Sequence, residues 1–310
     1  MNAELRCGND WTMTLERPYD EMEQFKLSDG RRLRRKFLRN PIGVAGGVIL
    51  LIVLMGAVFA EYFAPHEPNK QRLIARFKPP FWAEGGSMTY PLGTDNVGRD
   101  IWSRIIHGSR ISLIVGVCAV GVSMLIGVTL GLISGFWGGR VDSVIMALVD
   151  IMLAFPQLIL AFAMVAVLGP GIGNIILVLG ITGWERYARV VRAEVLALRE
   201  REFVQAARAV GVSNLKIVFG HIMPNTFSSV IVMATLQTAQ AILAEAALSF
   251  LGLGTGRTYP SWGQMISLGR DYISIAWWLS TFPGLAILLT VLAINLVGDR
   301  IRDVLDPRVT

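Results

Sequence analysis

The chain has 310 residues, of which 53% are hydrophobic and only 17% are charged, with a formal net charge of +6. A soluble globular domain carries about 25% charged residues, so this composition excludes most soluble classes and is typical of an integral membrane protein. The two cysteines, the three scattered histidines and the lack of a phosphate-binding glycine motif give no catalytic centre, disulfide, metal site or cofactor site, and we expect none.

The first 40 residues are predicted to form a basic tail in the cytoplasm. Residues 1–30 contain seven acids and little apolar content, which is typical of a mobile segment. Six basic residues then precede the first apolar run, namely Arg31, Arg32, Arg34, Arg35, Lys36 and Arg39. Because basic residues beside a span stay on the cytoplasmic side, this cluster orients the first span strongly.

Apolar segments then alternate with polar ones over residues 41–310. A transmembrane helix needs roughly 20 apolar residues. The uncharged run at 42–60 is too long, and too far from the start, to be an ordinary signal peptide. We therefore predict an all-α integral membrane protein with six transmembrane helices, at about 42–63, 111–136, 143–168, 174–188, 226–251 and 281–298.

Charge distribution tests the fourth of these spans, which has the shortest uncharged run. With six spans and both termini in the cytoplasm, 20 of the 29 Lys and Arg residues lie on the inner side. Removing the fourth span would move the basic residues of 185–225 outside and reverse the bias. Six spans with cytoplasmic N- and C-termini are therefore expected.

Two outer segments are rich in features that suit either sealing or docking. Thr94 or Asp95 can cap a helix lying on the membrane surface, whose apolar residues share one side: Ile101, Trp102, Ile105 and Ile106. This helix would either close the outer mouth or help to dock a soluble partner. The aromatic loop at 252–281, which contains Trp262, leaves the same two interpretations open.

Asp150 is an ionisable residue about seven positions into the third predicted span. Such residues usually pair with another group or face a wet cavity. We favour pairing with a nearby arginine such as Arg140 or Arg186 over a proton relay, for which Glu245 would be the partner. Pro156 follows Asp150 and is expected to kink the helix.

The largest charged insert lies between the fourth and fifth spans, at about 189–225, and faces the cytoplasm in this topology. Residues 185–210 contain no Gly or Pro and predict one continuous helix. Gly211 ends this helix, Ser213 or Asn214 can cap a second short one, and Pro224 begins the return to the membrane.

Three polar residues interrupt the fifth span. Gln237, Gln240 and Glu245 project from a helix within about 140° of one another. They are expected either to line a translocation pathway or to form inter-helix hydrogen bonds with a partner subunit, and Glu245, near the outer end, suits a structural role better.

The insert carries QAARAVG at residues 205–211, followed by Ile222 and Pro224. This pattern resembles the cytoplasmic coupling loop of bacterial ABC importer permeases, in which Glu-Ala-Ala precedes a glycine by three residues and Ile-x-x-Pro follows. The resemblance implies that ATP-binding subunits dock on the loop at Gln205, Ala206, Ala207, Gly211, Ile222 and Pro224. Because Gln205 stands where the family has Glu, we expect the contact to depend on shape more than on charge.

Three further strings narrow the resemblance, which covers about residues 31–310, to the dipeptide/oligopeptide/nickel permease group and its second permease type. They are LGTDNVGRD at 92–100, SFLGLG at 249–254 with PSWG at 260–263, and DRIRDVLDP at 299–307. The resemblance implies a bacterial inner-membrane subunit that shares its pathway with a second, non-identical permease and does not itself hydrolyse ATP. Two ATP-binding subunits and a periplasmic or lipid-anchored solute-binding protein would complete the importer. The binding protein would dock near Asp95, Arg99, Asp100 and Trp262.

The predicted substrate rests only on how common each substrate class is within this permease group, which favours dipeptides or oligopeptides. Nickel, glutathione and an opine- or sugar-like solute remain alternatives, and no nucleic-acid partner is expected. Two other classes stay open: an ion-coupled secondary transporter acting through Asp150 and Glu245, and a membrane scaffold. The secondary transporter would predict inverted repeats and broken helices, and the two halves of the sequence show no convincing repeat.

Overall fold

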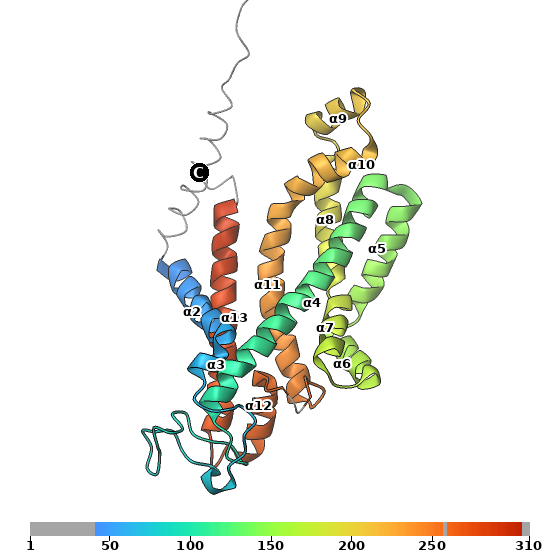
Figure 1. The fold of residues 1–310 in the computed structure, drawn as a ribbon. Helices are drawn as coiled ribbons and strands as arrows, with labels where there is room; N and C mark the ends of the chain where they lie inside the picture. The colour runs from blue at the N-terminus through green and yellow to red at the C-terminus, as the bar shows by residue number, and fades with distance from the viewer. Residues whose placement is uncertain (1–40, 257–258, 306–310) are drawn as a thin grey trace, which may run out of the picture.

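The computed structural model describes residues 41–256 and 259–305, so the expected basic tail at 1–40 lies outside the described part of the chain. Within the described ranges the regular elements are helices, and the only β-type pairing is an isolated bridge between Thr94 and Asp100. Figure 1 shows an elongated bundle of helices. The predicted all-α class is confirmed.

The helices are joined by short connections, except for the long segment between α3 and α4. Two 3-10 turns (Leu73–Ala75 and Arg270–Tyr272) lie in the longer loops, and a π-helical turn (Val218–Ile222) leads from α10 into α11. The helices are α2 (Pro41–Val58), α3 (Ala60–Phe63), α4 (Ile101–Trp137), α5 (Gly139–Ala154), α6 (Gln157–Leu168), α7 (Ile172–Ile181), α8 (Trp184–Leu198), α9 (Glu202–Ala209), α10 (Asn214–Ile217), α11 (Met223–Phe250), α12 (Trp262–Gly269) and α13 (Trp278–Leu305).

Membrane-crossing helices account for most of the bundle. Among the described residues, four segments are long and apolar enough to span a bilayer: Pro41–Val58, Ile101–Trp137, Asn214–Phe250 and Trp278–Val304. The pair α5 and α6 adds a fifth if it is counted as one span. The predicted span at 174–188 falls across α7 and the start of α8, which separate at Thr182 and Gly183. The total of six spans and the location of the termini stay predictions.

The third predicted span, 143–168, is not one straight helix. It breaks after Ala154, and α6 leaves α5 at an angle of 88°. Phe155 and Pro156 have extended backbone angles at this point. Because proline lacks the amide N–H and clashes with the preceding turn, the kink expected at Pro156 occurs. The angle of the kink depends on packing, because hydropathy shows which residues are apolar and not the direction in which a helix runs.

A stripe of glycines brings α4 close to α8. Gly127, Gly131 and Gly135 are buried and occupy the same face of α4, four residues apart. A Cβ added at Gly127 would lie 2.3 Å from the carbonyl oxygen of Trp184, so the two backbones nearly touch. Small residues at this spacing let membrane helices approach closely.

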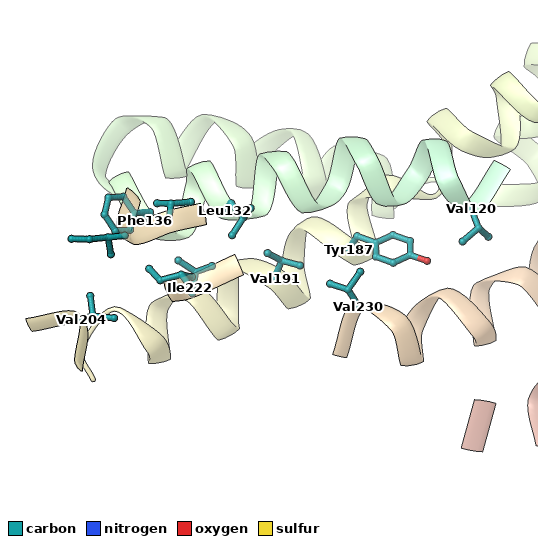
Figure 2. Close-up of a cluster of buried hydrophobic side chains, with 11 residues drawn as sticks. Val120, Leu132, Phe136, Tyr187, Val191, Val204, Ile222 and Val230 are labelled. Atoms are coloured by element: carbon teal, nitrogen blue, oxygen red, sulfur yellow. The ribbon is translucent and has the colours of Figure 1, made fainter. Parts of the chain in front are cut away.

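Around this contact lies the apolar cluster drawn in Figure 2, where α4, α8, α9 and the start of α11 meet. Val204 of α9 and Ile222 of the π-helical turn reach into it with no exposed surface. On the other side of α4, α11 packs against α13, and α13 packs against α2 (Figure 1). The buried cluster therefore anchors the polar insert directly onto the membrane helices. Its members are Val120, Leu132, Phe136, Tyr187, Val191, Val195, Val204, Ile217, Val218, Ile222 and Val230.

Candidate coupling segment and pathway face

The polar insert at 189–225, hereafter the coupling segment, begins with a break that the sequence did not predict. Instead of one helix over 185–210, α8 ends at Leu198 and α9 begins at Glu202. Arg201 has an extended backbone at the turn. This break lets Val204 enter the apolar cluster, and the burial of that side chain overrides the high helix propensity of the intervening residues.

The end of α9 is confirmed at Gly211. This glycine has a positive φ of 84°, which residues with a side chain rarely adopt. Its amide donates to the carbonyl of Arg208 at 3.0 Å, and the amide of Val212 donates to the carbonyl of Ala207 at 3.0 Å. These two bonds form the Schellman arrangement that closes a helix. Ser213 then occupies the N-cap position of α10, as expected.

The six positions implied as docking residues divide into two groups. Gln205, Ala206, Gly211 and Pro224 are exposed. Ala207 is half-buried against the apolar cluster, and Ile222 is fully buried within it. The first group offers surface to a partner, whereas the second holds the coupling segment to the bundle. Gln205 also donates from Nε2 to the carbonyl of Arg199 at 3.2 Å, which bridges the turn between α8 and α9.

Gln237 and Gln240, two of the three predicted pathway residues, lie together on α11 and share one arginine. The Arg186 guanidinium donates to Gln237 Oε1 at 3.4 Å and also to Gln240 Oε1. It further donates to Gln157 Oε1, at the start of α6, at 3.1 Å. We call these four residues the amide cluster. Sequence reasoning missed Gln157, and named Arg186 only as a possible partner of Asp150, because the helices that carry the four side chains are far apart in the chain.

Glu245, the third predicted pathway residue, lies in different surroundings. Its side chain is fully buried and accepts hydrogen bonds from Ser249 Oγ at 2.6 Å and from Ser112 Oγ at 3.2 Å. Ser261, the N-cap of α12, lies 3.3 Å from Ser249 Oγ. The carboxylate thus joins α4, α11 and α12, which matches the role in helix contacts that its position suggested.

Asp150 pairs with an arginine, as expected, but with a different one. Arg189 Nη2 donates to its carboxylate at 2.5 Å, whereas Arg186 belongs to the amide cluster. Arg189 lies one turn further along the same side of α8 than Arg186, so the two arginines differ in their position along the helix axis rather than in the face they occupy. No described contact links Asp150 with Glu245.

The outer segment also differs from its prediction. Residues 101–106 are not a separate surface helix but the first turns of α4, a continuous helix of 37 residues. Asp100, not Thr94 or Asp95, is its N-cap and accepts from the Ser103 amide at 3.1 Å. Asp95 is occupied within the preceding loop, where its carboxylate accepts from Arg99 Nε at 2.5 Å and from two backbone amides.

The residues implied in docking a binding protein mostly lie inside this outer end. Asp95, Asp100 and Trp262 are buried, and Arg99 is half-buried. The indole of Trp262 donates to the carbonyl of Ile105 at 3.0 Å, which fixes α12 to α4. These side chains therefore shape the outer end rather than provide its contact surface.

Two family models match separate parts of the chain. A family model described as the binding-protein-dependent transport system inner membrane component matches residues 127–310. A second model, the N-terminal TM domain of oligopeptide transport permease C, matches residues 28–80. The chain belongs to the binding-protein-dependent transport permease family. The longer match contains both the coupling segment and the amide cluster.

Relatives of this permease cover nearly its whole length. The di/tripeptide transport system permease protein DppC of Pseudomonas aeruginosa (strain UCBPP-PA14) is 45% identical over 274 residues, which is 88% of this chain and 90% of the relative. The dipeptide transport system permease protein DppC of Escherichia coli (strain K12) is 49% identical over 272 residues, 88% and 91% of the two chains. An inward-facing structure of the MetNI methionine ABC transporter shares the fold, with a TM-score of 0.54 at 21% identity over 66% of this chain and 98% of that one.

Family membership fixes the broad role of the permease. It is a multi-pass component of the bacterial inner membrane that works in an ABC importer with ATP-binding subunits and a substrate-binding protein. It is a transport component and not an enzyme, and ATP hydrolysis belongs to the separate subunits.

Proposed function

We propose that this permease imports dipeptides and forms the membrane pathway together with a second, non-identical permease. The substrate assignment is supported by the relatives named as di/tripeptide and dipeptide permeases, which are 45% and 49% identical, respectively, over most of the chain. Oligopeptides, nickel, glutathione and an opine- or sugar-like solute are the alternatives. The test is uptake of labelled alanyl-alanine by cells that carry or lack this chain. Uptake that is unaffected by deletion, with loss of nickel or glutathione uptake instead, would reassign the substrate.

We further propose that the coupling segment docks on an ATP-binding subunit. The observation that supports this is the apolar surface around its exposed motif residues. Four large side chains of the segment are exposed, by 44% to 84% of their surface: Phe203, Val210, Leu215 and Phe219. Phe203 and Val210, on α9, lie outside the candidate membrane-spanning segments, and exposed apolar side chains in such a place are typical of a protein contact. Ala206 lies on the same segment with a side chain short enough to let another helix approach.

A charge at Ala206 tests this docking. Ala207 is less suitable, because a charge there would also disturb the apolar cluster against which it packs. We expect Ala206→Glu to lower dipeptide uptake at least tenfold and to reduce co-purification of the ATP-binding subunit. Ala193→Glu, at an exposed alanine of α8 outside the patch, is the matched control and should keep both. Parental uptake in Ala206→Glu, or equal losses in the two variants, would contradict the docking role.

The topology is proposed together with this function. Six spans place the coupling segment and both termini in the cytoplasm, as the distribution of basic residues favours. A single cysteine at the exposed position Ala206, in a chain lacking Cys7 and Cys118, should react with a membrane-impermeant maleimide only in inverted vesicles. Labelling in intact spheroplasts would overturn this orientation.

A further inference from the structure

In the amide cluster, three neutral side chains hold the charged guanidinium of Arg186 in place. Arg186 donates hydrogen bonds to three amide oxygens, on Gln157 of α6 and on Gln237 and Gln240 of α11. A guanidinium has five N–H donors in a fixed plane, and amide oxygens satisfy them without cancelling the charge. The arginine is thus oriented by three side chains from two helices other than its own.

The next two arginines along α8 each pair with a carboxylate instead. Arg189 pairs with Asp150, and Arg192 pairs with Asp142 through two hydrogen bonds of 2.5 and 2.6 Å. Arg186 Nε also forms an ion pair with Oε1 of the adjacent Glu185, but at 3.8 Å this contact is longer than a hydrogen bond. Arg186 therefore differs from its neighbours in making its described hydrogen bonds to neutral groups, which leaves it available to an anionic group.

The space beside the cluster suits one small polar group. Gln157, Gln237 and Gln240 line a cavity of about 20 Å³, which is enough for one water-sized group. Gln237 is buried, and its Nε2 has no hydrogen-bond partner within the described ranges, so this side chain retains an unused donor. The side chain of Arg186 is 37% exposed and Gln240 is exposed as well. A ligand could place one end at the cluster and keep its bulk on this open side.

We propose that the amide cluster binds the carboxylate of the peptide during its passage, with Arg186 as the charged contact. The proposal rests on the proposed function, because a dipeptide presents an ionised α-carboxylate at neutral pH. Hydrogen bonds between a guanidinium and a carboxylate are about twice as strong as neutral ones, so the carboxylate displaces the amide oxygens. After release the amides return to Arg186. The peptide carboxylate therefore binds weakly enough for the substrate to leave, as transport requires.

The experiment uses the complete importer with its binding protein, reconstituted in liposomes. The probes are alanyl-alanine, which has a single carboxylate, and alanyl-alanine amide, which has none, each supplied with the binding protein fully loaded. Arg186→Gln is the test variant, Arg186→Lys keeps the charge without the planar fork, and Arg189→Gln is the matched control one turn away. Because every variant meets the same binding protein, its preference cancels when variant and parent are compared on one probe.

We expect Arg186→Gln to lower transport of the free acid about tenfold or more relative to the parent, the loss typical of a hydrogen bond to a charged group. Transport of the amide should change less than about twofold, and Arg186→Lys should recover part of the loss. Arg189→Gln should affect both probes equally. Absence of amide transport by the parent, with the free acid lost in Arg186→Gln and partly restored in Arg186→Lys, would equally support the proposal.

Two results separate the possible failures. If Arg186→Gln lowers both probes by the same factor, or lowers the yield and thermal stability of the complex as much as transport, Arg186 is only a link between helices and the inference is wrong. If the parent does not transport alanyl-alanine while its ATPase responds to another loaded receptor, the proposed substrate class is wrong instead. Retained free-acid transport in Arg186→Gln overturns the carboxylate site directly.

Discussion

Gly127→Ala should separate α4 from α8, because this glycine has no room for a side chain. Its added Cβ would lie 2.3 Å from the carbonyl oxygen of Trp184 and 2.5 Å from Cβ of Tyr187, whereas ordinary contact begins at 3.4 Å. The two helices must therefore move apart by about 1 Å, and overpacking of this kind costs about 1–3 kcal/mol. The matched control is Gly121→Ala on the same helix, where an added Cβ meets nothing within 4 Å.

The assay is thermal denaturation of the detergent-purified chain, followed by the loss of its monodisperse peak in size-exclusion chromatography. A cost of about 2 kcal/mol corresponds to a fall of about 3 °C in apparent Tm for a protein of this size. Gly121→Ala should have an equal or higher Tm, because alanine is the better helix former. Equal values for Gly127→Ala and the parent would show that α4 and α8 are not held as closely as the glycines indicate.

Two other substitutions test the inner and outer ends of the bundle. Burial raises the pKa of Glu194, whose Oε2 has no hydrogen-bond partner in the described part of the chain, so its ionised form destabilises the folded state above the unfolded pKa. Glu194→Gln should therefore raise the apparent Tm more at pH 7 than at pH 4.5, and a gain that does not depend on pH would refute this. Trp262→Phe removes the indole hydrogen bond to the backbone of α4 and should lower the Tm, at a cost of about 1–3 kcal/mol. Trp277→Phe, at a residue with 44% of its surface exposed, should change it little, and equal effects would argue against this anchoring.

The sequence predicts the helical class and the long membrane helices, because a run of apolar residues has few other stable forms in lipid. It does not predict the directions in which successive helices run. Residues 143–168 have the length and composition of one span, yet the chain turns by 88° at Pro156. The proline marks the position of the bend, but its angle depends on what α6 packs against, including Gln157 bound to Arg186.

The same limit applies to the coupling segment. Gly211 ends a helix through its own backbone preference, so the sequence predicts that boundary. The break between Leu198 and Glu202 has no such signal, since it exists because Val204 is buried between α4 and α8. A local sequence pattern reflects the conformational preferences of its own residues, whereas this break depends on packing against residues that are distant in the sequence.

Side-chain partners are the hardest feature to predict. Gln237, Gln240 and Glu245 fall within one sector of a helical projection, yet the glutamines meet Arg186 and the glutamate meets serines. The charge beside the glutamines comes from α8, more than fifty residues earlier in the chain. The sequence of α11 alone therefore does not predict a positive charge beside the glutamines, which the tertiary fold supplies.

Helix α4 also has a mechanical consequence. Its 37 residues make a rod of about 55 Å, well beyond the roughly 30 Å of the hydrocarbon layer. Trp262 is fixed near one end, and at the other the guanidinium of Arg208, on α9, lies over the ring of Phe136 at 5.4 Å. A tilt of about 10° about the midpoint would shift each end by about 5 Å in opposite directions. As a rigid lever, α4 would therefore convert a push on the end near the coupling segment into an opposite movement of its other end, without any change in its own conformation.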